Sequence, residues 1–297
     1  MELLIYLILF LFVLIVSSTT NKLLPFLPLP LVQILLGIVI GLFLPNTDFH
    51  LNTELFLALV IGPLLFRESE EADVTAILKH WRIIVYLIFP VIFISTLSLG
   101  GLAHLLWLSL PLAACLAVGA ALGPTDLVAF ASLSERFSFP KRVSNILKGE
   151  GLLNDASGLV AFRVALAAWT TGAFSLSQAG TSLALSIIGG FAVGFVTAMI
   201  NRFLHTFLLS MRATDIASEL LLELSLPLMT FFIAEEIHVS GIIAVVVAGI
   251  LKASRFKKIT LLEAQVDTVT DTVWHTVTFM LNGSVFVILG MELEMIA

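Results

Sequence analysis

Gly149-Glu-Gly-Leu-Leu-Asn-Asp-Ala-Ser-Gly158 places two acids and an asparagine at the start of an apolar run over residues 146–169. Charged side chains inside a bilayer cost several kcal/mol and are candidates for function by default. Gly151, Asp155 and Gly158 recur at spacings of four and three residues, so they share one helical face. Small residues on that face permit another helix to approach closely. The stretch therefore predicts a membrane helix that brings Asp155 against a neighbouring helix.

The rest of the sequence has the composition of a membrane protein. Of the 297 residues, 59% are apolar and 12% are charged, and the mean hydropathy is +1.09. Soluble domains have about 45–50% apolar and about 25% charged residues. The chain therefore carries half the charge that a soluble surface needs. This excludes a soluble enzyme and leaves no extramembrane domain to expect.

Apolar runs separated by polar, proline or charged breaks predict ten membrane-spanning helices. A span requires about 20 residues, so the predicted fold class is an all-α polytopic membrane protein. The runs occupy residues 2–17, 29–44, 53–67, 81–102, 105–133, 146–169, 179–201, 215–235, 239–251 and 269–291.

Charge in the loops predicts the orientation. Fourteen of the 15 Lys and Arg residues flank alternate loops on one side, and cytoplasmic loops collect these residues. The N-terminus and, after an even number of spans, the C-terminus are therefore predicted to lie outside the plasma membrane. The net charge of −6 leaves no basic stripe for phosphates and excludes a nucleic-acid partner.

A helix breaker interrupts the fifth run at Gly123-Pro124, directly before Thr125 and Asp126. Pro124 removes a backbone donor, and non-helical backbone at membrane depth persists only where it lines a cavity or is packed in protein. Exposed carbonyls, a hydroxyl and a carboxylate are oxygen ligands for a small hard cation. The alternative is a kink in which Thr125 or Asp126 caps the second half-helix.

Two acids on adjacent spans, one of them beside broken helix, form the substrate site expected of a secondary transporter. A carboxylate withdrawn from water binds a proton more readily, so Asp155 can exchange a proton for a cation. Asn154, about 100° around the helix, can brace the same region through hydrogen bonds. Competition for one carboxylate is the physical basis of antiport.

The two polar stretches resemble the signatures of a known family. Gly123-Pro-Thr-Asp-Leu-Val-Ala129 and Leu147-Lys-Gly-Glu-Gly-Leu-Leu-Asn-Asp-Ala-Ser157 are similar to those of the monovalent cation:proton antiporter-1 family, the NhaP-like sodium/proton exchangers. Further similar stretches follow in order along the chain: Leu27-Pro-Leu-Pro-Leu31, Pro63-Leu-Leu-Phe66, Val239-Ser-Gly-Ile-Ile-Ala-Val-Val-Val-Ala-Gly249 and Phe279-Met-Leu-Asn-Gly283.

The resemblance implies an inverted-repeat antiporter fold and an ion site. Asp155 resembles the carboxylate that binds the ion and the proton, and Thr125 and Asp126 resemble the ligands on the unwound helix. These three residues form the implied Na+ site. Asn154 resembles the asparagine associated with electroneutral exchange. The implied partners are monovalent cations, protons and the lipid bilayer; a homodimer is left open, and no cofactor is implied.

Three other positions are implied to support this site. Glu150 resembles a structural acid that pairs with an arginine of the second repeat. Gly151 stands where a serine hydroxyl often helps to hold the ion, which is a departure from the family pattern, as is Leu127 in place of a proline. Glu68 lies within one position of the family's acid after the Pro-Leu-Leu-Phe stretch.

The family's core consists of two inverted repeats. Residues 1–169 are predicted to form the first repeat, and residues 179–297 a linker helix and part of the second, with the sequence ending near that repeat's fourth helix. The similarity of residues 34–42 to residues 242–250, in spans of opposite direction, is typical of an inverted repeat.

The predicted function is the exchange of Na+, with Li+ or K+ as alternatives, for protons by alternating access, with electroneutral stoichiometry. The alternative is a truncated, transport-inactive homologue, or one part of a split transporter, that acts as a membrane interaction partner. A membrane enzyme is the least supported interpretation, since no His-Glu-x-x-His or Gly-x-Ser-x-Gly motif occurs.

Three more charged residues lie in or near the predicted spans. Arg163 is about 20 Å along the helix from Glu150, too far to pair with it, and is expected to snorkel or to pair with another helix. Glu219 and Glu223 lie one turn apart. They line either a water-filled funnel or the membrane surface.

Overall fold

The computed structural model describes residues 2–24, 26–43, 52–124, 139–171, 176–211, 215–253 and 261–296. Within these ranges all regular secondary structure is helical and no strand occurs. The predicted all-α fold class is therefore confirmed.

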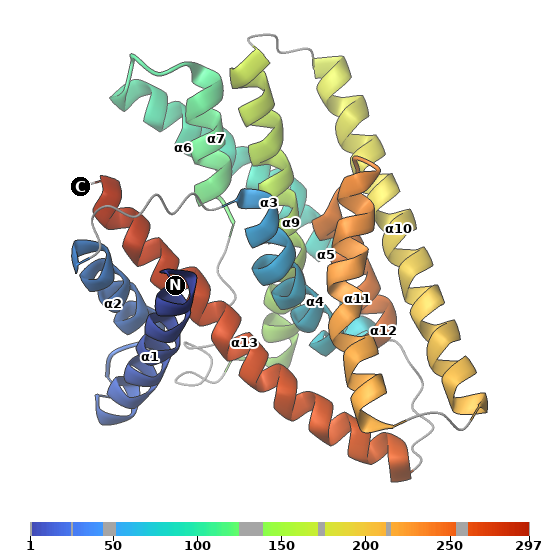
Figure 1. Ribbon diagram of the computed structural model, residues 1–297. Helices are drawn as coiled ribbons and strands as arrows, with labels where there is room; N and C mark the ends of the chain where they lie inside the picture. Colours follow the sequence, from blue (N-terminus) through green and yellow to red (C-terminus); the bar gives the residue numbers. More distant parts are fainter. Residues whose placement is uncertain are drawn as a thin grey trace. The chain divides into compact units, whose positions relative to one another are not determined.

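In the described ranges the elements join into ten continuous helices, each of which overlaps one predicted span, and several extend beyond the predicted bounds (Figure 1). The fifth predicted span extends beyond its helix, because α7 ends at Leu122 and residues 125–138 lie outside the described part. The elements are α1 (Glu2–Leu23), α2 (Leu29–Phe43), α3 (Thr53–Phe56) with η1 (Leu57–Ile61) and α4 (Gly62–Glu71), α5 (Val74–Tyr86) with η2 (Leu87–Val91) and α6 (Ile92–Leu106), α7 (Leu112–Leu122), α9 (Lys141–Thr171), α10 (Leu176–Ser210), α11 (Ile216–Glu236), α12 (Gly241–Ala253) and α13 (Leu261–Ile296).

Three of the described helices are long and apolar enough to cross a membrane, over Ala184–Ser210, Ile216–Glu236 and Thr268–Leu293. Six shorter apolar helices also occur in the described residues: Ile8–Leu23, Leu29–Leu42, Ile92–Leu106, Leu112–Leu122, Ser157–Thr170 and Gly241–Ala253. The number of helices that span the bilayer stays a prediction.

Two of the continuous helices contain a π turn next to a proline. The π turn η1 ends two residues before Pro63, and η2 contains Pro90. Proline lacks a backbone N–H, and its ring crowds the carbonyl four residues earlier. A wider turn accommodates this crowding while the helix continues.

The helix α11 begins at a capping box made by Asp215 and Ser218. The Ser218 N–H donates to Asp215 Oδ1 at 2.8 Å, and the Asp215 N–H donates to Ser218 Oγ at 3.2 Å. The side chain of Ser218 and then its backbone N–H stabilise the charged carboxylate by hydrogen bonding, and they hold the pKa of Asp215 below its usual value. The carboxylate therefore remains an acceptor at neutral pH, and the cap weakens only in acid.

Contacts divide the chain into two compact units. The first comprises Met1–Leu64 with Ile259–Ala297, and the second comprises Leu65–Lys258. This division reports packing and not internal symmetry, so the two predicted repeats stay a prediction. The candidate site residues that the structure describes belong to the second unit.

In the first unit, α13 packs along α2, and α1 contacts both helices (Figure 1). A close approach occurs at Gly37 and Gly290, where a Cβ added to Gly290 would overlap the backbone oxygen of Ile34 and lie 3.0 Å from the Cα of Gly37. Without a side chain at these positions the two backbones can approach closely, which is a common way for helices to associate in membranes.

In the second unit, the helices that carry the polar residues pack in two connected groups. The helix α7 contacts α6 and α9, and α5 also contacts α9. The helices α10, α11 and α12 contact one another, and α9 contacts both α10 and α12.

We expect Gly290→Ala to destabilise the protein although alanine is the better helix former. The added methyl group meets backbone that cannot move without separating α2 from α13, and overpacking of this kind costs about 1–3 kcal/mol. Thermal unfolding of the detergent-solubilised chain, followed by circular dichroism, measures the effect as a lower Tm.

Gly101→Ala in α6 is the matched control, because nothing lies within 4 Å of a Cβ at that position. This variant should keep or raise the Tm, since alanine in a helix is favoured by about 0.5–1 kcal/mol over glycine. An equal response of the two variants would contradict the packing assigned to Gly290.

Candidate functional site

The first half of α9 holds a buried acid and a buried amide side by side. Glu150 and Asn154 lie one turn apart, with 6% and 2% of their surfaces exposed. The Asn154 Nδ2 donates a hydrogen bond to Glu150 Oε1 at 2.8 Å. A hydrogen bond to a charged acceptor contributes about 1.5–3 kcal/mol, so this contact orients the amide and stabilises the carboxylate inside the helix bundle.

The end of α7 meets the same helix at its small residues. The last residue of α7 is Leu122, and a Cβ on Gly158 would overlap the ring of Pro124. The close approach expected from the small residues of this face therefore occurs, and it involves the proline of the predicted helix break. Gly151, one turn before Asp155, is also buried.

The structure describes only part of the predicted ion site. Thr125 and Asp126 lie outside the described residues. Asp155 belongs to α9 and directly follows Asn154, but its side chain lies outside the described part. Glu68 lies in α4, and its role stays a prediction, as does the arginine partner implied for Glu150.

A second polar group was not predicted as a unit from the sequence. The Lys252 Nζ, in the last turn of α12, lies 2.6 Å from Glu223 Oε1 of α11 and 3.0 Å from Glu70 Oε1 of α4. Between 11% and 15% of each of the three side chains is exposed. The guanidinium of Arg67 also contacts Glu70, at 3.0 Å. We refer to Lys252, Glu70, Glu223 and Arg67 as the Lys252 cluster.

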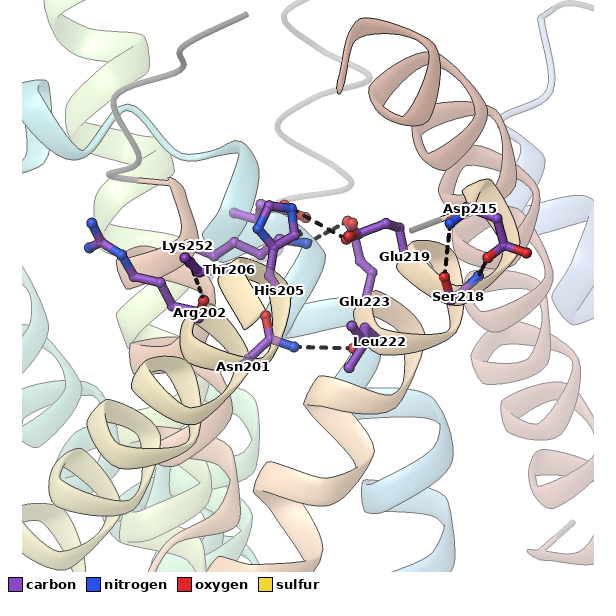
Figure 2. Close-up of polar contacts among 11 residues, drawn as sticks. Asn201, Arg202, His205, Thr206, Asp215, Ser218, Glu219, Leu222, Glu223 and Lys252 are labelled. Atoms are coloured by element: carbon purple, nitrogen blue, oxygen red, sulfur yellow. Dashed lines mark hydrogen bonds and ion pairs between the residues drawn. The ribbon is translucent and has the colours of Figure 1, made fainter. Parts of the chain in front are cut away.

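The interface between α10 and α11 continues this cluster with further polar contacts. Figure 2 shows His205 and Lys252 directed toward Glu219 and Glu223. The His205 Nε2 lies 3.4 Å from Glu219 Oε2, and the pair is ionic when the imidazole is protonated. The Asn201 Nδ2 donates to the backbone oxygen of Leu222 at 3.4 Å.

A small cavity adjoins these contacts between α10, α11 and α12. Its volume is about 20 Å³, and Asn201, Arg202 and Lys252 supply its polar lining. A space of this size can hold one water molecule. In this conformation Glu219 lies close to His205 and Glu223 contacts Lys252, beside one small cavity. The two roles considered for these acids, lining a water-filled funnel or lying at the membrane surface, both stay predictions.

Arg163 pairs with another helix, as expected. Its Nη1 lies 3.2 Å from Glu235 Oε1, at the end of α11. The same oxygen accepts a hydrogen bond from the Gly241 N–H, at the start of α12, at 3.2 Å. Glu235 therefore joins the ends of two helices and connects both to α9. The positive end of the α12 dipole also favours a carboxylate at this position.

The Lys252 cluster was missed because hydropathy placed Glu70 and Lys252 in loops. The acidic segment Glu68–Glu71 follows the third apolar run, and Lys252 follows the ninth. The sequence does indicate that the helix continues past the apolar run, because Arg67 and Glu71 have the i, i+4 spacing of a helical ion pair. The two residues form this pair, with 2.7 Å between Arg67 Nε and Glu71 Oε1.

Comparison with known proteins identifies close relatives. The chain is 38% identical over 278 residues to the sodium, potassium, lithium and rubidium/H+ antiporter of Bacillus subtilis, covering 94% of this chain and 42% of that protein. It is 33% identical to the uncharacterized Na+/H+ exchanger YjcE of Escherichia coli, covering 93% of this chain and 51% of that protein. The chain thus spans about half of these relatives or less.

Solved structures have the same fold. The structure of the sodium proton antiporter MjNhaP1 from Methanocaldococcus jannaschii at pH 8 superposes with a TM-score of 0.73 at 20% identity, covering 98% of this chain and 71% of that one. The family described as "Sodium/hydrogen exchanger, transmembrane" matches residues 7–297. With nearly the whole chain matched, this protein belongs to the transmembrane sodium/hydrogen exchanger family.

Proposed function

We propose that the protein exchanges a monovalent cation for protons across the plasma membrane. The observation that carries the proposal is the buried Glu150–Asn154 pair on α9, next to the end of α7, in a chain of the sodium/hydrogen exchanger family. The exchange proceeds by alternating access and is electroneutral. The loops rich in Lys and Arg face the cytoplasm, and a homodimer is the assembly to test.

Asp155 is the group for which the two ions compete. It binds either a proton or the cation, and Thr125 and Asp126 supply further oxygen ligands from the broken helix. Small hard cations prefer such oxygen ligands. Asn154, held by Glu150, positions the neighbouring residue of α9. Gly151 leaves room on the same helical face, so that water can complete the cation's coordination.

Which cation the protein transports can be tested by comparing several cations directly. The printed name of the Bacillus subtilis relative includes Na+, K+, Li+ and Rb+. Selectivity depends on the size of the site and on the number and field of its ligands. Na+ is proposed as the principal substrate, with Li+ or K+ as alternatives.

The Lys252 cluster is proposed to hold α12 against α4 and α11 in the present conformation. Its three helices come from separate parts of the chain, and charged contacts of small exposure fix their register. Alternating access moves helices relative to one another, so these contacts either move as one body or separate during transport.

In everted vesicles that contain this chain, adding Na+ should produce a pH change, and Asp155→Asn should abolish it. The amide keeps the size of the carboxylate but does not exchange a proton near neutral pH. Fluorescence of a pH-sensitive dye measures the signal, with NaCl, LiCl and KCl compared at equal protein content.

Glu236→Gln is the matched control, because Glu236 is an exposed acid at the end of α11; it should retain the signal. A response that survives Asp155→Asn would overturn the assignment of Asp155. A wild-type chain without any cation-dependent signal would overturn transport by this chain and favour the transport-inactive or split alternative.

Lys252→Met should lower the Tm of the detergent-solubilised chain. The change removes the ammonium that lies between Glu70 and Glu223 while keeping the aliphatic stem, and removing one partner of a buried ion pair is strongly destabilising. Because these side chains are slightly exposed, we expect the free energy of unfolding to fall by about 2 kcal/mol. Lys22→Met, at an exposed position of α1, is the control.

A second variant separates charge from packing. Lys252→Met combined with Glu223→Gln removes both charges of the 2.6 Å contact and should recover part of the lost Tm. If the double variant is less stable than Lys252→Met alone, the contribution of Lys252 is not the neutralisation of Glu223.

A further inference from the structure

A basic hollow lies at the junction of α5 and α9, apart from the site described above. It has a volume of about 450 Å³ and is lined by Lys79, His80, Trp81, Arg82 and Ile83 of α5 and by Arg142 of α9. The two helices contact each other within the second unit. The hollow is therefore built from neighbouring elements and not from a single flexible segment.

The apolar side of the continuous helix formed by α5, η2 and α6 fixes the position of the cations on α5. Ile84, Ile88 and Ile92 form a buried cluster against which Ile146 of α9 packs. Arg142 lies one helical turn before Ile146, so it shares the face of α9 that meets α5. The packing of the isoleucines thus brings Arg142 to the same rim as Lys79 and Arg82.

The positive charge of this rim is not neutralised by the described part of the chain. Lys79, Arg82 and Arg142 are exposed, and none of the three has an ion pair with a described residue. By contrast, Lys252, Arg67 and Arg163 all contact carboxylates. An anion that binds in the hollow would therefore be attracted by three permanent positive charges.

Aromatic side chains place the hollow at the boundary between membrane and water. Trp81 and Tyr86 of α5 are 53% and 75% exposed, and Trp and Tyr collect at the level of the lipid headgroups. The guanidinium carbon of Arg82 lies 5.8 Å from the centre of the Trp81 ring. Directly after α5 and η2, α6 exposes large apolar side chains such as Phe93 and Ile94.

We propose that this hollow binds the headgroup of an anionic phospholipid. The phosphate is held by Arg82, Arg142 and Lys79, and the acyl chains extend along the apolar exposed surface that continues into α6. A free phosphate ion would use only the cations, whereas a lipid also uses the exposed aromatic and apolar side chains. The volume is that of a site for a ligand group of moderate size.

The test uses the purified full chain in detergent with added dioleoylphosphatidylglycerol or dioleoylphosphatidylcholine, and native mass spectrometry to count the retained lipids. The wild-type chain should retain the anionic lipid at least about tenfold better, since each cation near an anionic surface is worth about a factor of five. Arg82→Gln combined with Arg142→Gln should lose this preference. Equal retention of both lipids by the wild-type chain would overturn the proposal.

Two further variants control for net charge and folding. Lys22→Gln with Arg202→Gln removes the same charge from exposed positions elsewhere and should keep the preference. Arg82→Lys with Arg142→Lys keeps the charge and should retain most of it. Loss of the preference in the Lys22 and Arg202 variant, or its survival in the Arg82 and Arg142 glutamine variant, would contradict binding at the hollow.

An excess of inorganic phosphate distinguishes the two sources of the anion. The lipid should remain bound, because its acyl chains contribute contacts that phosphate lacks. If phosphate displaces the lipid completely and binds to the wild-type chain alone, the hollow is a site for a soluble anion and the lipid assignment is wrong.

Discussion

Removing a charged side chain from water costs more free energy than a helical bundle can absorb without a partner. This cost determines where the polar side chains of the second unit lie. Glu150 accepts a hydrogen bond from Asn154, Lys252 lies between Glu70 and Glu223, and Arg163 reaches Glu235. Several of these contacts join different helices, so satisfying the charges also fixes which helices are neighbours and in what register.

The apolar surfaces follow a different rule, because lipid tails compete with side chains for contact. Helices that meet in such an environment gain mainly from close packing. Gly37 with Gly290, and Gly158 with Pro124, permit that packing at two places in the fold. The polar pairs therefore supply specificity, and the small residues supply the short distances at which the helices associate.

Hydropathy predicted the helices well for a physical reason. A backbone among lipid tails must form its own hydrogen bonds, so an apolar run of sufficient length becomes a helix. The same method placed Lys252 and Glu70 in loops, since a pairing between residues far apart in sequence leaves no periodic pattern. For Arg163 the sequence indicated a partner on another helix but did not indicate Glu235.

The sequence predicted the packing at the candidate site better than it predicted the polar contacts there. The spacing of Gly151, Asp155 and Gly158 indicated a face for close approach, and Gly158 does meet Pro124. The hydrogen bond between Asn154 and Glu150 follows from their i, i+4 spacing, yet a partner for Glu150 was expected only from the resemblance to the family. The predicted ion ligands, which are Thr125, Asp126 and the side chain of Asp155, lie outside the described part of the chain and stay a prediction.

The two π turns change how these helices are compared with straight ones. A π turn closes its hydrogen bond over five residues instead of four, so it takes up one residue more than an α turn. Beyond Ile61 and beyond Val91, every side chain is rotated by about one residue, roughly 100°, from the direction that an unbroken 3.6-residue period assigns to it. In the helix formed by α5, η2 and α6, the π turn lies between two different surfaces. The basic and aromatic side chains come before the turn and the exposed apolar side chains come after it, so the direction of each group follows its own helical period. Compared with a straight helix, each π turn acts as a one-residue insertion. The face on which a side chain lies must therefore be worked out separately before and after the turn.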